Sequence, residues 1–161
     1  MDASAQPAHT LDARTVTVWR IQTLVWGVPM FVVGLAASVA LWLIDPGVVA
    51  VLPLLAAAVW LAVALTVVPA VRYRRWRWEV TDEEIRLQRG LIIIQRTVVP
   101  MVRVQHVDTS QGPINGAFGL SEVRISTAAG THSIPALADE NAAELRDRIA
   151  RLARVRDDGG L

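Results

Sequence analysis

Three residues near the middle of the chain have the side chains of a catalytic acid, base and nucleophile. His106, Asp108 and Ser110 stand two residues apart, so on a regular strand they would share one face. A Ser–His–Asp triad also needs a continuous chain of hydrogen bonds and an oxyanion donor, and the spacing alone supplies neither. We therefore expect polar surface or turn residues here, with no catalytic residue and no enzyme activity.

Metal and cofactor chemistry have little support in the sequence. His106, Asp108 and His132 could bind a metal ion if they lay on neighbouring strands, because histidines from different strands can converge on zinc. The chain has no cysteine, no H-x-x-x-H spacing and no glycine-rich phosphate loop. We expect no metal and no cofactor, and the lack of cysteine also excludes disulfides and thiolate catalysis.

Basic and aromatic residues alternate in the segment RYRRWRW, residues 72–78. One interpretation is contact with anionic headgroups, worth about 1 kcal/mol per arginine near the surface. Base stacking is a second interpretation, which the net charge of +1 disfavours, and we expect no nucleic-acid partner. A third is a topology signal that needs no ligand. The candidate headgroup-contacting residues are Arg72, Arg74, Arg75, Arg77, Trp76 and Trp78.

Two uncharged apolar runs, residues 21–44 and 48–71, precede this segment. Each has 24 residues, which as a helix reach about 36 Å against a hydrocarbon core of about 30 Å. Asp45-Pro46-Gly47 between them is a turn signature. We expect a transmembrane hairpin over residues 21–71, in which the small-residue pairs Gly34/Ser38 and Ala58/Ala62 allow close approach of the helices. Residues 1–20 would form an N-terminal tail, disordered over residues 1–13.

The rest of the chain changes to short alternating segments, which predict a β domain over residues 76–156 and a tail at 157–161. The apolar phase changes between Val104 and Val107, which predicts a bulge near Gln105. A C-terminal helix buried on the sheet is predicted by an apolar stripe of Ala138, Ala142, Leu145, Ile149, Leu152 and Val155. The expected strands are residues 76–80, 84–89, 91–99, 101–111, 120–127 and 131–135.

Several motifs stand in a recognisable order along this part of the chain. They are VTDEE at 80–84, QHVDTSQGPI at 105–114, FGL at 118–120, VRISTA at 123–128 and IPALA at 134–138. In these motifs the chain resembles the bacterial membrane-flanked pleckstrin-homology (PH)-like domain family, over about residues 15–155. The resemblance implies a barrel of about seven strands in two sheets, capped by a C-terminal helix, with no assigned catalytic residues. Asn115-Gly116 departs from the family pattern, which places a basic residue there.

Two classes of function are left. The first is a non-enzymatic interaction or scaffold module at the cytoplasmic face of the cell membrane, working with a larger membrane paralogue or another membrane protein. A PH-like fold offers a sheet edge for this purpose. The alternative is an accessory subunit of a membrane transporter or membrane enzyme, which the lack of an ionisable residue within either apolar run disfavours. The candidate interaction surface is Arg103, Gln105, His106, Asp108 and Gln111.

The distribution of arginine predicts the topology. Arginines flank the hairpin on both outer sides, whereas the turn between the runs carries only Asp45. By the positive-inside rule both termini should be cytoplasmic. Reporter fusions after Gly47 and after Leu161 check this prediction. The first should report an external site and the second an internal one, and an external C-terminus would contradict it.

Overall fold

The structure is a computed structural model that describes residues 7–158, with the side chains described as far as residue 155. It divides into two compact units. One is a helical hairpin, residues 16–71. The other is a β domain that begins at residue 72 and also includes the N-terminal segment up to residue 15.

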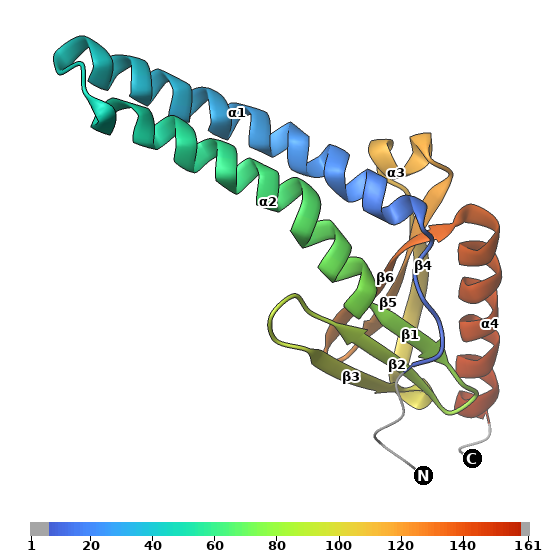
Figure 1. Cartoon of the computed structure of the whole chain (residues 1–161). Helices are drawn as coiled ribbons and strands as arrows, with labels where there is room; N and C mark the ends of the chain where they lie inside the picture. The colour runs from blue at the N-terminus through green and yellow to red at the C-terminus, as the bar shows by residue number, and fades with distance from the viewer. Residues whose placement is uncertain (1–6, 159–161) are drawn as a thin grey trace. The chain divides into compact units, whose positions relative to one another are not determined.

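The hairpin consists of helices α1 (Arg14–Ile44) and α2 (Leu52–Arg75), joined by a short 3-10 helix, η1 (Val48–Val51). The two helices run antiparallel (Figure 1). Both are long and apolar enough to cross a membrane. Large apolar side chains point outward along them, and Trp26 and Leu43 are each 79% exposed. A soluble core would bury such side chains, so this surface suits a lipid environment.

The helices approach most closely where small residues face one another. A Cβ atom on Gly34 would lie 2.7 Å from the Cβ of Ala57 and 3.1 Å from the carbonyl oxygen of Pro53. One turn further, the backbone N–H of Leu54 donates to Ser38 Oγ at 2.9 Å. Leu54 is in the first turn of α2, where N–H groups lack an intrahelical acceptor and lipid offers none. The close approach expected at Gly34 and Ser38 is confirmed, whereas Ala58 and Ala62 are exposed and the alanine that faces Gly34 is Ala57.

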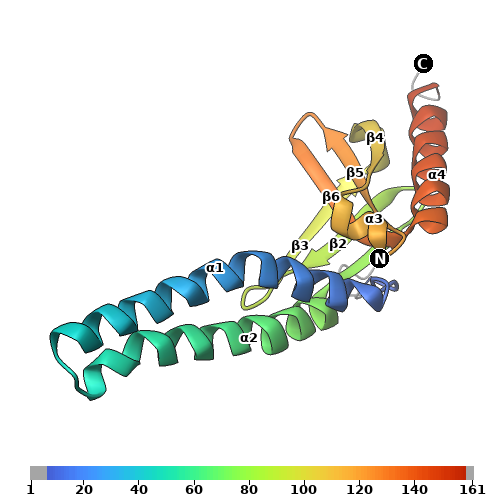
Figure 2. The ribbon, with the colours of Figure 1, turned by 90° about the horizontal axis from the view of Figure 1, so that it is seen from above.

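The β domain contains two antiparallel three-stranded sheets and a C-terminal helix (Figure 2). Neighbours in the first sheet are β1 (Arg77–Val80), β2 (Glu84–Arg89) and β3 (Gln95–Pro100). Neighbours in the second are β4 (Val104–Ser110), β5 (Leu120–Thr127) and β6 (Gly130–Ala138). The connections include η2 (Met101–Arg103) and α3 (Pro113–Ala117), and α4 (Asp139–Asp158) ends the chain.

The expected two sheets and C-terminal helix are confirmed, but the described residues form six strands in two open sheets rather than a closed barrel of about seven strands. Next to β1, the N-terminal segment contributes one bridge, between His9 and Trp78. Between β3 and β4, Pro100 and the 3-10 turn η2 redirect the chain from one sheet to the other.

The strand expected from residue 91 begins only at Gln95. Arg89 pairs with Gln95, so residues 90–94 must close the hairpin despite their β-branched side chains. Gly90 makes this closure possible, because its φ is +146° and a Cβ atom would lie 1.9 Å from the carbonyl oxygen of Ile93. Turn geometry therefore overrides the β propensity of the isoleucines.

The bulge predicted near Gln105 is confirmed. Val104 pairs with Thr127, and the next pair is His106 with Ser126, which leaves Gln105 without a partner residue in the ladder. The extra residue lets both Val104 and Val107 be half-buried.

The core of the β domain is formed by side chains from the two sheets, from η2 and from α4. Its fully buried side chains include Ile85, Met101, Leu120, Ile125 and Ile134 from the strands and η2. The helix stripe is confirmed for Ala142, Leu145 and Ile149, which are buried, but not for Val155, which is 71% exposed. The start of α4 is fixed to the sheet by the Asp139 carboxylate, which accepts a hydrogen bond from Ser121 Oγ at 2.7 Å.

The N-terminal segment is ordered from residue 7, contrary to the disordered tail expected over residues 1–13; residues 1–6 lie outside the described chain. Leu11 is buried, and its carbonyl accepts a hydrogen bond from the Tyr73 hydroxyl at 3.2 Å. Asp12 pairs with Arg14 at 2.9 Å, and Arg14 Nη1 donates to the carbonyl of Phe118 at 2.9 Å. The hydrogen bond from Arg14 lowers the pKa of the Asp12 carboxyl.

Replacement of Ile149 by alanine tests the role of α4. Ile149 is fully buried, so we expect the free energy of unfolding to fall by about 2–5 kcal/mol. Denaturant unfolding of the full chain in detergent measures it. Arg151→Ala, at an exposed position of the same helix, is the control. A loss below about 0.5 kcal/mol, the usual range for surface changes, would show that Ile149 is not part of the core.

Gly34→Val tests the contact between the spans. The Ala57 Cβ and the Pro53 backbone cannot move aside easily, and overpacking of this kind costs about 1–3 kcal/mol. We expect helicity to be lost at a lower SDS fraction, measured by circular dichroism. Gly47→Val is the matched control, because nothing lies within 4 Å of the added Cβ. Equal midpoints for the two variants would mean that the helices do not pack at Gly34.

The Asp12–Arg14 pair predicts a pH dependence. Because the pKa of Asp12 is lowered in the folded chain, the pair stabilises the fold above the unfolded-state pKa of about 3.9. This contribution is lost as the pH falls through the folded-state pKa. The difference in unfolding free energy between the natural chain and Asp12→Asn should therefore be constant near neutral pH and shrink below about pH 4. A difference that does not change with pH would contradict the pairing.

Candidate functional site

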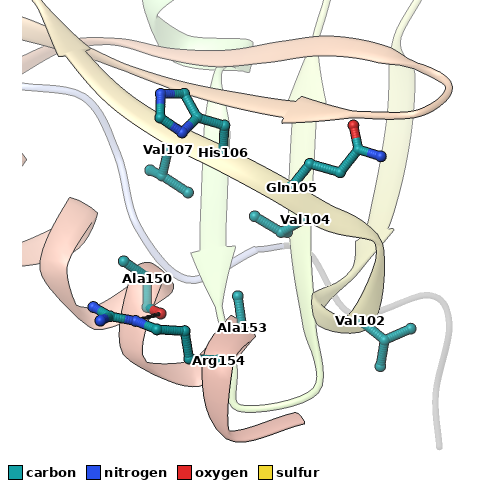
Figure 3. Close-up of a pocket in the computed structure, with 8 residues that line it drawn as sticks. All are labelled: Val102, Val104, Gln105, His106, Val107, Ala150, Ala153 and Arg154. Atoms are coloured by element: carbon teal, nitrogen blue, oxygen red, sulfur yellow. Dashed lines mark hydrogen bonds between the residues drawn. The ribbon is translucent and has the colours of Figure 1, made fainter. Parts of the chain in front are cut away.

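A cavity of about 840 Å³ lies between the start of β4 and the last third of α4 (Figure 3). Residues 102–107 line one side, apart from Arg103, and Ala150, Ala153 and Arg154 line the other. Its volume is that of a ligand-binding pocket, for which 300–1,000 Å³ is the usual range. It is therefore a candidate binding site of the β domain.

The bulge and the small residues of α4 together form this cavity. Because Gln105 is the extra residue, Val107 points toward α4, whereas His106 points away from it (Figure 3). Opposite β4, the helix presents Ala150 and Ala153, whose short side chains leave the space unfilled. Arg154 turns back along its helix, and its Nε donates to the carbonyl of Ala150 at 3.2 Å.

Charged groups lie at the rim of the cavity. His106 Nε2 is 2.9 Å from Asp108 Oδ1, and these side chains are 70% and 55% exposed. A pair so exposed contributes little to stability, about 0–1 kcal/mol. Ser110 is half-buried at the far end of β4, and in the described part of the chain no hydrogen bond joins it to His106. The three residues therefore do not form a connected triad.

Four of the five residues of the expected interaction surface lie at or beside the cavity. Gln105 and His106 line it, and Arg103 and Asp108 are exposed next to them. Gln111 lies just past the other end of β4, where its Nε2 donates to both carboxylate oxygens of Asp139, at 2.9 and 3.0 Å. Gln111 therefore has a structural role that the sequence did not indicate.

Sequence analysis missed the helix side of the cavity. Ala150, Ala153 and Arg154 carry no motif. The one available signal is the pair of alanines beside the buried stripe, which marks a place where the helix can leave space next to the sheet.

The segment 72–78 is divided between two elements. Arg72, Arg74 and Arg75 form the last turn of α2, where basic side chains interact favourably with the helix dipole. Trp76 is only 6% exposed, which is at odds with contact between its ring and headgroups. Arg77 and Trp78 begin β1.

Trp78 and Arg77 both have partners inside the β domain. The ring of Trp78 stacks on the ring of His9, with 4.7 Å between the ring centroids. Trp78 Nε1 donates a hydrogen bond to the carbonyl oxygen of Thr10 at 3.2 Å. Arg77 Nη1 donates to the carbonyl of Trp76 at 3.3 Å. Arg72 and Arg74 are the exposed arginines of this segment, and both belong to the last turn of α2.

Metal binding finds no support among the described residues. They contain no group of three histidine, aspartate or glutamate side chains that could hold a metal ion.

Comparison with known proteins gives consistent results. The sequence model of the bacterial PH domain family matches residues 23–153. The chain is 42% identical to the UPF0699 transmembrane protein YdbS of Bacillus subtilis (strain 168) over 161 residues, which cover 95% of this chain and 97% of YdbS. It is 28% identical over 91 residues to the UPF0699 transmembrane protein YdbT of the same strain, which cover 56% of this chain but 18% of YdbT.

No solved structure matches the chain significantly. The family match extends over most of the sequence, and the relative that aligns from end to end is named a transmembrane protein. The structure agrees with both findings, because two long apolar helices are followed by two sheets and a C-terminal helix. The chain is thus a membrane protein that belongs to the bacterial PH domain family.

Proposed function

We propose that this protein is a membrane-anchored, non-enzymatic interaction module whose PH-like domain faces the cytoplasm and binds an extended segment of a membrane protein along β4. The observation that carries the proposal is the edge of β4. In the described sheet β4 pairs with β5 alone, so its other edge has backbone groups available for an added strand. The cavity beside α4 opens next to that edge.

The regular part of β4 fits such a segment. From His106 to Ser110 the register with β5 is continuous, so the outer backbone groups alternate evenly. The bulge at Gln105 ends this stretch and limits pairing to about five residues. In an added strand every second side chain points to the same face, and those on the α4 side could fill the space above Ala150 and Ala153.

The chemistry of the rim favours an acidic segment. Arg103 and Arg154 are exposed on the two sides of the cavity. Asp108 is paired with His106, which reduces its repulsion toward a bound carboxylate. Arginine is well suited to carboxylates because its guanidinium can donate two parallel hydrogen bonds.

A longer member of the same family is the partner we favour. YdbT is named a transmembrane protein, as YdbS is, and the segment similar to this chain makes up 18% of YdbT. One bacterium thus has a short and a long relative of this chain. Interaction between two such membrane proteins needs no soluble ligand and agrees with the cytoplasmic orientation that the arginines of residues 14, 20 and 72–77 favour.

Photo-crosslinking in native membranes tests the proposal. A photoreactive amino acid at Gln105, at the cavity, should crosslink to one membrane protein, whereas the same amino acid at Glu140, in the first turn of α4, should not. Ala153→Trp would fill the cavity and should abolish the crosslink. Arg151→Trp places the same side chain at an exposed position and should keep it.

The identity of the crosslinked protein also separates the alternatives. A transporter or an enzyme would make this chain an accessory subunit. Crosslinks to lipid alone, or a protein crosslink that Ala153→Trp leaves intact, would contradict binding at β4.

A further inference from the structure

The turn between β2 and β3 has an apolar surface that the β domain does not use. Leu91, Ile92, Ile93 and Ile94 are 37%, 87%, 76% and 46% exposed. Single exposed apolar residues are common, but four in succession at the tip of a hairpin are not. Gly90 folds the turn tightly, since a Cβ there would collide with the carbonyl oxygen of Ile93. We refer to residues 90–94 as the apolar turn.

We propose that the apolar turn inserts into the interfacial region of the membrane and forms a second membrane contact besides the helical hairpin. The proposal concerns the bilayer itself, and it is independent of whether a partner binds along β4.

The first supporting observation is the contact between the apolar turn and the end of α2. Arg75 Nη1 donates to the carbonyl oxygen of Leu91 at 2.6 Å and to that of Ile92 at 3.4 Å. Arg75 is the last residue of α2 and stands four residues after the second apolar run. Four helical residues advance only about 6 Å, so a carbonyl held by Arg75 stays close to the membrane surface.

These hydrogen bonds also reduce the main energetic cost of inserting a turn into the membrane interface, which is the loss of water as a hydrogen-bond donor to the backbone carbonyls. Backbone carbonyls that leave water need another donor, because lipid chains supply none. The guanidinium of Arg75 supplies it to Leu91 and Ile92, the two residues that follow Gly90 in the apolar turn. A turn of the same composition without this donor would hold its carbonyls in water.

The second observation is the charge around the apolar turn. Residues 85–107 contain four arginines and no carboxylate. Arg89 and Arg96 lie just behind the turn on its two strands, and both are exposed. An apolar tip with arginines behind it matches the layers of an anionic membrane, in which headgroup phosphates lie above the acyl chains.

The alternative occupants of this surface are a second copy of the chain and another protein. Among the described residues, nothing around the apolar turn favours either of these occupants over lipid. The hydrogen bond from Arg75, at the end of α2, to the Leu91 carbonyl favours lipid. The experiment below distinguishes these occupants.

The test uses the absence of cysteine from the natural sequence. Ile92→Cys and, as a control, Val155→Cys each provide a single site for an environment-sensitive fluorophore. Val155 is 71% exposed on α4, so the two positions have similar exposure in the domain. Each labelled full-length chain is reconstituted in vesicles of phosphatidylcholine with phosphatidylglycerol, and quenching by aqueous iodide is compared with quenching by lipids that carry a nitroxide in the acyl chain.

We expect the label at residue 92 to be protected from iodide and quenched by the nitroxide lipid several-fold more than the label at residue 155. Replacing Arg75 by glutamine should reduce this difference, because it removes the donor to the turn carbonyls. Free access of iodide to residue 92 would overturn the proposal. Protection from iodide without quenching by the lipid would also overturn it, because it would show that protein covers the apolar turn.

Discussion

The continuity of α2 with the β domain is the constraint from which most other features follow. Helix α2 ends at Arg75 and β1 begins at Arg77, so a single residue, Trp76, separates a candidate membrane span from the first sheet. A connection this short cannot act as a flexible tether. The first strand of the β domain therefore begins directly after the candidate span, and Trp76 itself is buried rather than free to act as a hinge.

Local patterns in the sequence were sufficient to predict the features that depend on a single helix, strand or hairpin. The two uncharged runs predict the helical hairpin, and Gly34 and Ser38 predict its contact, because helices in lipid pack through small residues. The phase change between Val104 and Val107 predicts the bulge, since side chains alternate strictly along a strand. The stripe through Leu145 and Ile149 predicts the buried face of α4 in the same way.

Features that depend on two distant segments were not predictable. Residues around His9 contribute one bridge beside β1, and no pattern in the N-terminal tail indicates this pairing. The side chain of Asp139, at the start of α4, accepts hydrogen bonds from Gln111 and Ser121, which are distant from it in the sequence. Likewise, Ala136 has a φ of +52° at an irregularity of the β5–β6 ladder. The residues next to Ala136 in the sequence do not indicate this left-handed conformation. The cavity beside β4 results from missing side-chain volume at Ala150 and Ala153, which becomes visible only when the facing element is known.

The apolar turn is connected to β4 through a single strand and a 3-10 turn. The proposed membrane contact would therefore affect how β4 is presented to a partner. Strand β3 runs from the apolar turn to Pro100, and η2 then leads directly into β4. A domain attached to the membrane by α2 and also by the apolar turn has less freedom to reorient than a domain attached by α2 alone. The β4 edge would then be confined near other proteins in the same membrane. Because confinement of this kind raises the effective concentration of one binding site for another, a pairing of about five residues, too short to be strong in solution, can suffice between two membrane proteins.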